Sequence, residues 1–208
     1  MKQLKKLALA SAIALSCVSS FAEELNFDTF NASQSLVNLT GSGYGGFIWT
    51  KFGVSDPFGG TGPGYATVGG ATNSAFNQSA DTATMSRADA FTLDSADFAG
   101  VWNDGLSLVV TGFKFDGTQL SQSFELSTQQ VTKAVFKDWT NLQSVSFASS
   151  GGTPNQVYPA GKGGKQFAMD NLRFNSSAPV PEPESFALLL AGMGLVGAAV
   201  RRRKAAKA

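Results

Sequence analysis

Paired carboxylates are the first candidates for chemistry in this sequence of 208 residues. Asp94 with Asp97, and Asp104 with Asp116, would suit a glycosidase, which needs two carboxylates across a cleft. Each pair lies beside turn residues, however, where Asp commonly bonds to the local backbone. The sequence has no histidine, which excludes serine-histidine and cysteine-histidine nucleophile systems. We therefore expect a protein that is not an enzyme.

Two glycine-rich segments, 59–70 and 149–164, are expected to be exposed loops. Their tyrosines, Tyr65 and Tyr158, are candidates for a glycan platform, because sugar rings stack on flat aromatic faces. Four further aromatic residues could form such a platform, but core packing is the favoured interpretation for most of them, because 17 Phe and 3 Trp must be buried somewhere. That set comprises Tyr44, Trp49, Trp102 and Trp139.

Residues 23–175 have the pattern of one all-β domain, with apolar residues at period two and turn residues about every 8 to 12 positions. This pattern predicts a β-sandwich or jelly roll of about nine strands. The clearest part is a β-hairpin over 106–126, closed by an Asp116-Gly117 turn. Further strands are expected at 25–30, 46–54, 75–77, 90–93, 131–136, 142–147 and 166–174.

The last expected strand contains a break in its alternation. Phe167 and Met169 share one side-chain phase, whereas Leu172 and Phe174 share the other. A β-bulge at Asp170-Asn171 would return both pairs to the core and redirect the Asp170 carboxylate.

Asp28 and Asp170 are candidate metal ligands if the first and last strands are neighbours. Together with loop carbonyls they could hold a structural Ca²⁺, which takes several oxygen ligands and needs no histidine. The alternative is that each carboxylate accepts hydrogen bonds from backbone amides at a strand end.

Both ends of the chain have the pattern of processing segments. Residues 1–22 combine three lysines, an apolar run and small residues before the cut, which predicts a signal peptide. We expect signal peptidase to cleave between Ala22 and Glu23 after the export machinery has engaged this signal helix. Residues 176–179 are a short linker to the C-terminal segment, 180–204.

Residues 23–179 carry eight Lys and Arg against 13 Asp and Glu, a net charge of −5. Nucleic-acid binding is therefore not expected, because it needs a basic surface to offset the phosphate charge.

The C-terminal segment has three parts in a fixed order. Val180, Pro181, Glu182 and Pro183 form an extended strip, because proline disfavours helix locally. Residues 186–200 are uncharged and would form a helix about 22 Å long, against a hydrocarbon core of about 30 Å. This predicts a short transmembrane helix. Cationic residues follow and fix the cytoplasmic end: Arg201, Arg202, Arg203 and Lys204.

This order resembles the PEP-CTERM sorting signal of Gram-negative bacteria, which is also catalogued as an ice-binding protein C-terminal domain. The resemblance implies transient residence in the inner membrane, recognition by an exosortase-type protease, and transfer to the cell surface or the medium. It also implies an association with exopolysaccharide production. An array of regularly repeated Thr, typical of ice-binding surfaces, is missing from the sequence.

The segments 25–30, 43–49 and 167–174 resemble the corresponding strands of carbohydrate-binding-type jelly rolls. We therefore expect an exported, non-catalytic surface or extracellular-matrix protein associated with exopolysaccharide. A secreted polysaccharide-processing enzyme and an adhesive surface protein are the alternatives.

Overall fold

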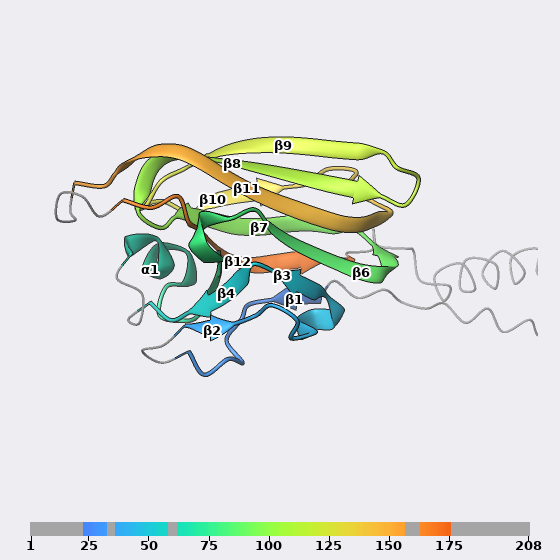
Figure 1. The fold of residues 1–208 in the computed structure, drawn as a ribbon, viewed down its shortest axis with the longest axis horizontal. Coiled ribbons are helices and arrows are strands. Elements are labelled where there is room, and N and C mark those ends of the chain that lie inside the picture. Colours follow the sequence, from blue (N-terminus) through green and yellow to red (C-terminus); the bar gives the residue numbers. More distant parts are fainter. Residues whose placement is uncertain (1–22, 33–35, 58–61, 157–162, 176–208) are drawn as a thin grey trace, which may run out of the picture.

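The computed structural model describes residues 23–32, 36–57, 62–156 and 163–175, which form an all-β sandwich of two sheets (Figure 1). The predicted signal peptide, linker and C-terminal segment lie outside these residues. One sheet runs in the order β10 (Thr132–Val135), β7 (Leu93–Gly100), β12 (Phe167–Phe174), β5 (Ser74–Asn77), β4 (Phe52–Ser55) and β2 (Val37–Asn38), with β1 (Glu23–Leu25) also paired to β12. The other runs β3 (Ile48–Thr50), β6 (Ala83–Phe91), β11 (Leu142–Pro154), β8 (Asn103–Lys114) and β9 (Gln119–Leu126).

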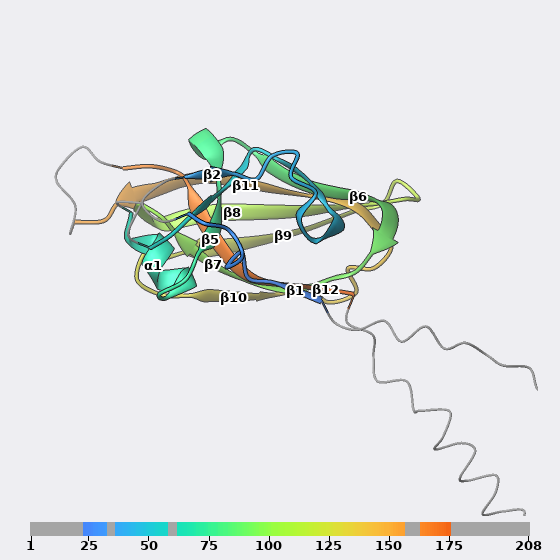
Figure 2. The ribbon, with the colours of Figure 1, turned by 90° about the horizontal axis from the view of Figure 1, so that it is seen from below.

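Three short helical segments accompany the sheets: η1 (Tyr44–Gly46), α1 (Pro63–Gly69) and η2 (Gln78–Ala80). Helix α1 lies at one end of the sandwich, where it packs on β7 and β12 (Figure 2). Within the described ranges, no helix is long and apolar enough to cross a membrane.

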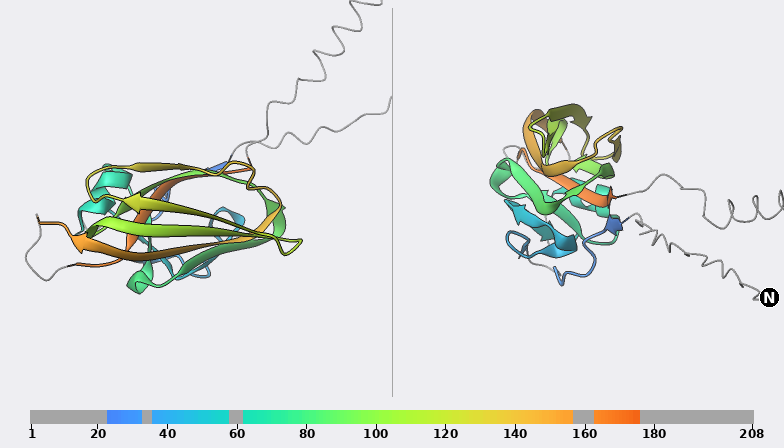
Figure 3. Two further views of the ribbon diagram at one scale, coloured as in Figure 1. Left: turned by 90° about the horizontal axis from the view of Figure 1, so that it is seen from above. Right: turned by 90° about the vertical axis from the view of Figure 1, so that its right-hand side faces the viewer.

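The predicted hairpin is confirmed as β8 and β9, and the long strand β11 runs beside β8 on its other side (Figure 3). Leu106 pairs with Leu126 in register, and the inward side chains of Leu106, Leu108 and Val110 are fully buried. Asp116 accepts a hydrogen bond from the Thr118 amide, while Gly117 adopts φ 84° in the turn. A glycine tolerates that angle without steric cost.

The described residues contain twelve strands rather than about nine. The segment expected as one strand at 46–54 divides into β3 and β4 because Lys51 adopts φ 60°. The sequence pattern did not predict β7, because polar residues that face outward from its sheet interrupt the apolar alternation. Residues 149–154 were expected as a loop but extend β11, because β8 is long enough to pair with them.

The core lies between the sheets and is dominated by aromatic rings. Phe147 of the five-stranded sheet meets Phe52, Phe98 and Phe167 of the seven-stranded sheet, with ring centroids 5.6, 6.1 and 6.0 Å away. Trp49 is fully buried and Trp139 is 5% exposed, which confirms core packing for these two residues. Such pairs stabilise a core beyond the area that they bury.

The contact of α1 with the sheet depends on a glycine. A Cβ atom added to Gly64 would lie 2.1 Å from the Gly100 carbonyl oxygen, so the helix could not approach β7 this closely with a larger residue. In contrast, a Cβ on Gly69 of the same helix would meet Ser74 at an ordinary distance of 3.6 Å.

We expect Gly64→Ala to lower the free energy of unfolding by about 1 to 3 kcal/mol, because the added methyl group overpacks the interface. The matched Gly69→Ala should be neutral or slightly stabilising, because alanine favours helix. Denaturant unfolding of both variants measures the difference. Equal stabilities would contradict the close approach of α1.

Candidate functional site at the bulge of the last strand

Strand β12 contains the predicted bulge. Its pairing with β7 shifts between Asp170 and Arg173 and again between Arg173 and Phe174, and Asn171 adopts φ 49°. The residues on both sides of the shift are fully buried in the core: Phe167, Met169, Leu172 and Phe174. The bulge therefore brings both phases of the strand to one face of the sheet, as the sequence pattern predicted.

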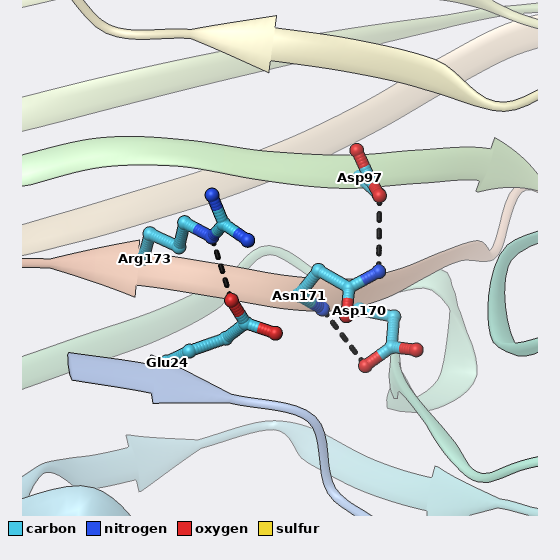
Figure 4. Close-up of polar contacts among 5 residues, drawn as sticks. All are labelled: Glu24, Asp97, Asp170, Asn171 and Arg173. Carbon is cyan, nitrogen blue, oxygen red and sulfur yellow. Dashed lines mark hydrogen bonds and ion pairs between the residues drawn. The ribbon is translucent and has the colours of Figure 1, made fainter. Parts of the chain in front are cut away.

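Two sets of polar contacts lie at the bulge: Asn171 with Asp97 and Asp170, and Arg173 with Glu24 (Figure 4). Asp170 and Asp97 are partners across β12 and β7. The Asn171 side-chain amide donates to Asp97 Oδ2 over 3.0 Å, and the Asn171 backbone amide donates to Asp170 Oδ1 over 2.8 Å. A single bulge residue thus orients both carboxylates.

A groove of about 190 Å³ lies beside the bulge, between β10, β7 and β12. Arg173 at its wall donates from Nε to Glu24 Oε2 over 2.6 Å, which ties β1 to β12. The groove is lined by charged, polar and small apolar side chains: Ser95, Asp97, Lys133, Ala134, Val135, Asn171 and Arg173.

Asp170 lies beside this groove but is only 4% exposed. Burial raises the pKa of Asp170 to about 7. The hydrogen bond from Asn171 acts in the opposite direction, while repulsion from Asp28, Asp97 and Glu24 adds to the rise. At neutral pH, Asp170 is therefore near its midpoint of protonation.

The first and last strands are neighbours, as the calcium hypothesis required, with Leu25 opposite Leu172. Asp28 Oδ1 accepts from the Asn73 amide over 3.2 Å, and the Asn73 side chain donates to the Phe27 and Phe30 carbonyls. Across the part of the chain that the structure describes, no three His, Cys, Asp or Glu side chains gather as a metal site. Asp28 and Asp170 alone supply too few oxygens for calcium, which takes six to eight.

Calcium binding therefore stays a prediction, and the backbone hydrogen bonds of both carboxylates match the alternative interpretation. Calorimetric titration with Ca²⁺, together with the melting temperature, tests it directly.

The acid pair of Asp104 and Asp116 shares no cleft. Asp104 lies near the start of β8 and Asp116 in the turn that follows it, about 40 Å apart along an extended chain. Burial alone would raise the pKa of Asp104, but hydrogen bonds from Thr128, Asn155 and Ser127 together lower it. Asp104 thus fastens the chain after β9 to the end of β11.

The exposed position expected for Tyr65 is wrong. Tyr65 belongs to α1, is 4% exposed, and packs edge-on against Phe76 with ring centroids 5.5 Å apart. Burial raises the pKa of its hydroxyl. Pro63 begins a helix within the glycine-rich segment and turns the ring onto the sheet, so Tyr65 offers no sugar platform. Tyr158 lies outside the described residues.

Sequence reasoning missed Lys133, Asn171 and Arg173 as groove residues. The phase break at Asp170-Asn171 was the signal that could have located them, because bulges redirect neighbouring side chains. Lys133 carries no such local mark, since its place depends on the pairing of β10 with β7.

Comparison with known proteins identifies the C-terminal segment. Residues 179–204 match the PEP-CTERM protein-sorting motif. Proteins with this motif are exported and sorted to the cell surface, and the motif implies processing by an exosortase. The match includes the predicted sorting residues, Val180, Pro181, Glu182, Pro183, Arg201, Arg202 and Arg203, which lie outside the described residues.

The sandwich is similar to several solved structures at low identity. A DUF4465 family protein from Bacteroides ovatus has 9% identity and a TM-score of 0.39, with 59% of this chain and 71% of that chain covered. TmCBM61 in complex with β-1,4-galactotriose has 7% identity and a TM-score of 0.37, covering 64% and 90%. The CBM22-1 and GH10 modules of a Clostridium thermocellum xylanase have 9% identity and a TM-score of 0.34, with 75% of this chain and 28% of that chain covered. No curated protein matches the chain.

We expect Asp170→Asn to change how stability depends on pH. A carboxyl whose pKa rises from 3.8 to about 7 on folding stabilises the protein fully below pH 4, and this contribution is lost as the pH rises through 7. The free energy of unfolding of the variant, relative to that of the wild type, should therefore increase between pH 4 and pH 8 by up to about 4 kcal/mol.

Thermal unfolding at both pH values measures this gain, and exposed Asp89→Asn serves as the matched control. A stability difference that does not change with pH would mean that Asp170 is ionised throughout.

Proposed function

We propose that this protein is a non-catalytic surface or extracellular-matrix protein that holds exopolysaccharide after export and exosortase processing. The observation that carries this proposal is the groove at the bulge, where fixed hydrogen-bond donors and acceptors converge. The pairing of β1 with β12, which is also found in jelly rolls, supports the expected relation to carbohydrate-binding modules.

The groove has the chemistry that a sugar ring needs. Asp97 and Asn171 are held in place by their mutual hydrogen bond, so they can contact hydroxyl groups with little loss of side-chain entropy. Val135 is 66% exposed and offers an apolar surface to the C–H face of a ring. The volume of about 190 Å³ suits a single ring of a chain that continues into solvent.

The same residues are poorly arranged for hydrolysis. Glycosidases place two accessible carboxylates on either side of the scissile bond. Asp97 lines the groove, but its cross-strand partner Asp170 is 4% exposed and is not part of the groove lining. Glu24, the next carboxylate, is engaged by Arg173. These positions support binding without cleavage.

Binding and cleavage can be separated in one experiment with the exported protein and exopolysaccharide from its own host. We expect co-sedimentation with the polysaccharide and no release of reducing ends. Asp97→Ala should weaken binding about tenfold, the effect of losing one hydrogen bond to a charged group. Exposed Asp89→Ala, on β6 of the other sheet, is the matched control.

Release of reducing ends would instead support a polysaccharide-processing enzyme. Equal binding by the Asp97 and Asp89 variants would remove the groove from the proposal.

The sorting step has its own test. Replacing Pro181, Glu182 and Pro183 with alanine should leave the protein in the inner membrane with its C-terminal segment uncut, because the extended strip would be lost. Fractionation and intact-mass measurement follow both properties. Normal release of this variant would show that the strip is dispensable.

A further inference from the structure

Two cationic side chains line the same groove of a domain that is acidic overall. Residues 23–179 carry a net charge of −5, yet two of their eight Lys and Arg residues, Lys133 and Arg173, line one groove of about 190 Å³. Asp97 is the acidic residue in the groove lining, and one of its oxygens already accepts from Asn171. The groove lining thus carries a formal net charge of +1, from Lys133 and Arg173 against Asp97, and Glu24 pairs with Arg173 from outside the lining.

Strand register places the two cations on opposite walls. Lys133 of β10 is opposite Asp97 of β7, while Ser95 of β7 is opposite Val135 on one side and Arg173 of β12 on the other. The strands of Lys133 and Arg173 are thus separated by β7, or about 9.6 Å at the usual strand spacing. Within the described residues, Lys133 forms no ion pair of its own.

Arg173 is held in position for a further ligand. Its Nε bond to Glu24 fixes the guanidinium, which lies on the β7 side of that bond (Figure 4). The four N–H groups on the terminal nitrogens extend beyond this contact, and the planar guanidinium matches a carboxylate. Glu24 therefore orients Arg173 and leaves it able to bind a second anion.

We propose that the groove binds a carboxylated polysaccharide, with one sugar acid on Arg173 and a neighbouring one reaching Lys133. Asp97 accepts hydrogen bonds from hydroxyl groups of these two sugars, and Val135 packs against the ring that lies in the groove. This inference rests on the proposed function, because it names the class of polysaccharide that the same groove holds.

The test uses the exported protein with polygalacturonate and with its fully methyl-esterified form, which keeps the backbone and removes the charge. We expect the acid form to bind about tenfold more tightly, and its binding to weaken as salt is added. Lys133→Gln should weaken binding to the acid form by about tenfold and leave binding to the ester almost unchanged.

Lys165→Gln is the matched control, since this exposed lysine lies six residues before Asn171, about 20 Å along an extended chain. Equal affinity for the acid and the ester, or equal effects of the two lysine variants, would overturn the carboxylate preference and leave the proposed function standing. Failure to bind polygalacturonate, its ester and the host exopolysaccharide alike would overturn both.

Discussion

The strict alternation of side chains along a β-strand is the constraint on which this structure depends. Strand β12 lies at the centre of the seven-stranded sheet and must bury Phe167 and Met169 together with Leu172 and Phe174, which have opposite phases. One extra residue resolves the conflict, because a bulge shifts the phase by one position. Asn171 is well suited to it, since asparagine tolerates positive φ better than most residues.

The outer face of the sheet takes its chemistry from the same bulge. The Asn171 amide holds Asp97, its backbone N–H holds Asp170, and β1 adds Glu24 to position Arg173. Helix α1 covers the neighbouring part of this face with an apolar cluster. The core therefore sets where the bulge falls, and the bulge sets which polar groups converge in the groove.

Local patterns predicted the parts of the fold that depend on local chemistry. The hairpin followed from an Asp-Gly turn between two alternating stripes, and the bulge followed from a phase break that only an extra residue could repair. The helix around Tyr65 was missed because its stability comes from close packing at Gly64 rather than from helix propensity.

Strand pairing explains the remaining differences. The polar residues of β7 and the glycines of β11 form strands because their neighbours supply hydrogen bonds, which no local pattern records. Lys133 joins the groove for the same reason, because only the register of β10 places it opposite Asp97.

Deleting Asn171 tests the role of the bulge most directly. Without this residue, Phe167, Met169, Leu172 and Phe174 alternate regularly, so the strand can bury all four without a bulge. We predict a folded protein, recognised by a cooperative thermal transition, that no longer binds the host exopolysaccharide. An unfolded protein would contradict the claim that the bulge only corrects the alternation of side chains. A folded protein with unchanged affinity would contradict the assignment of the groove to the bulge.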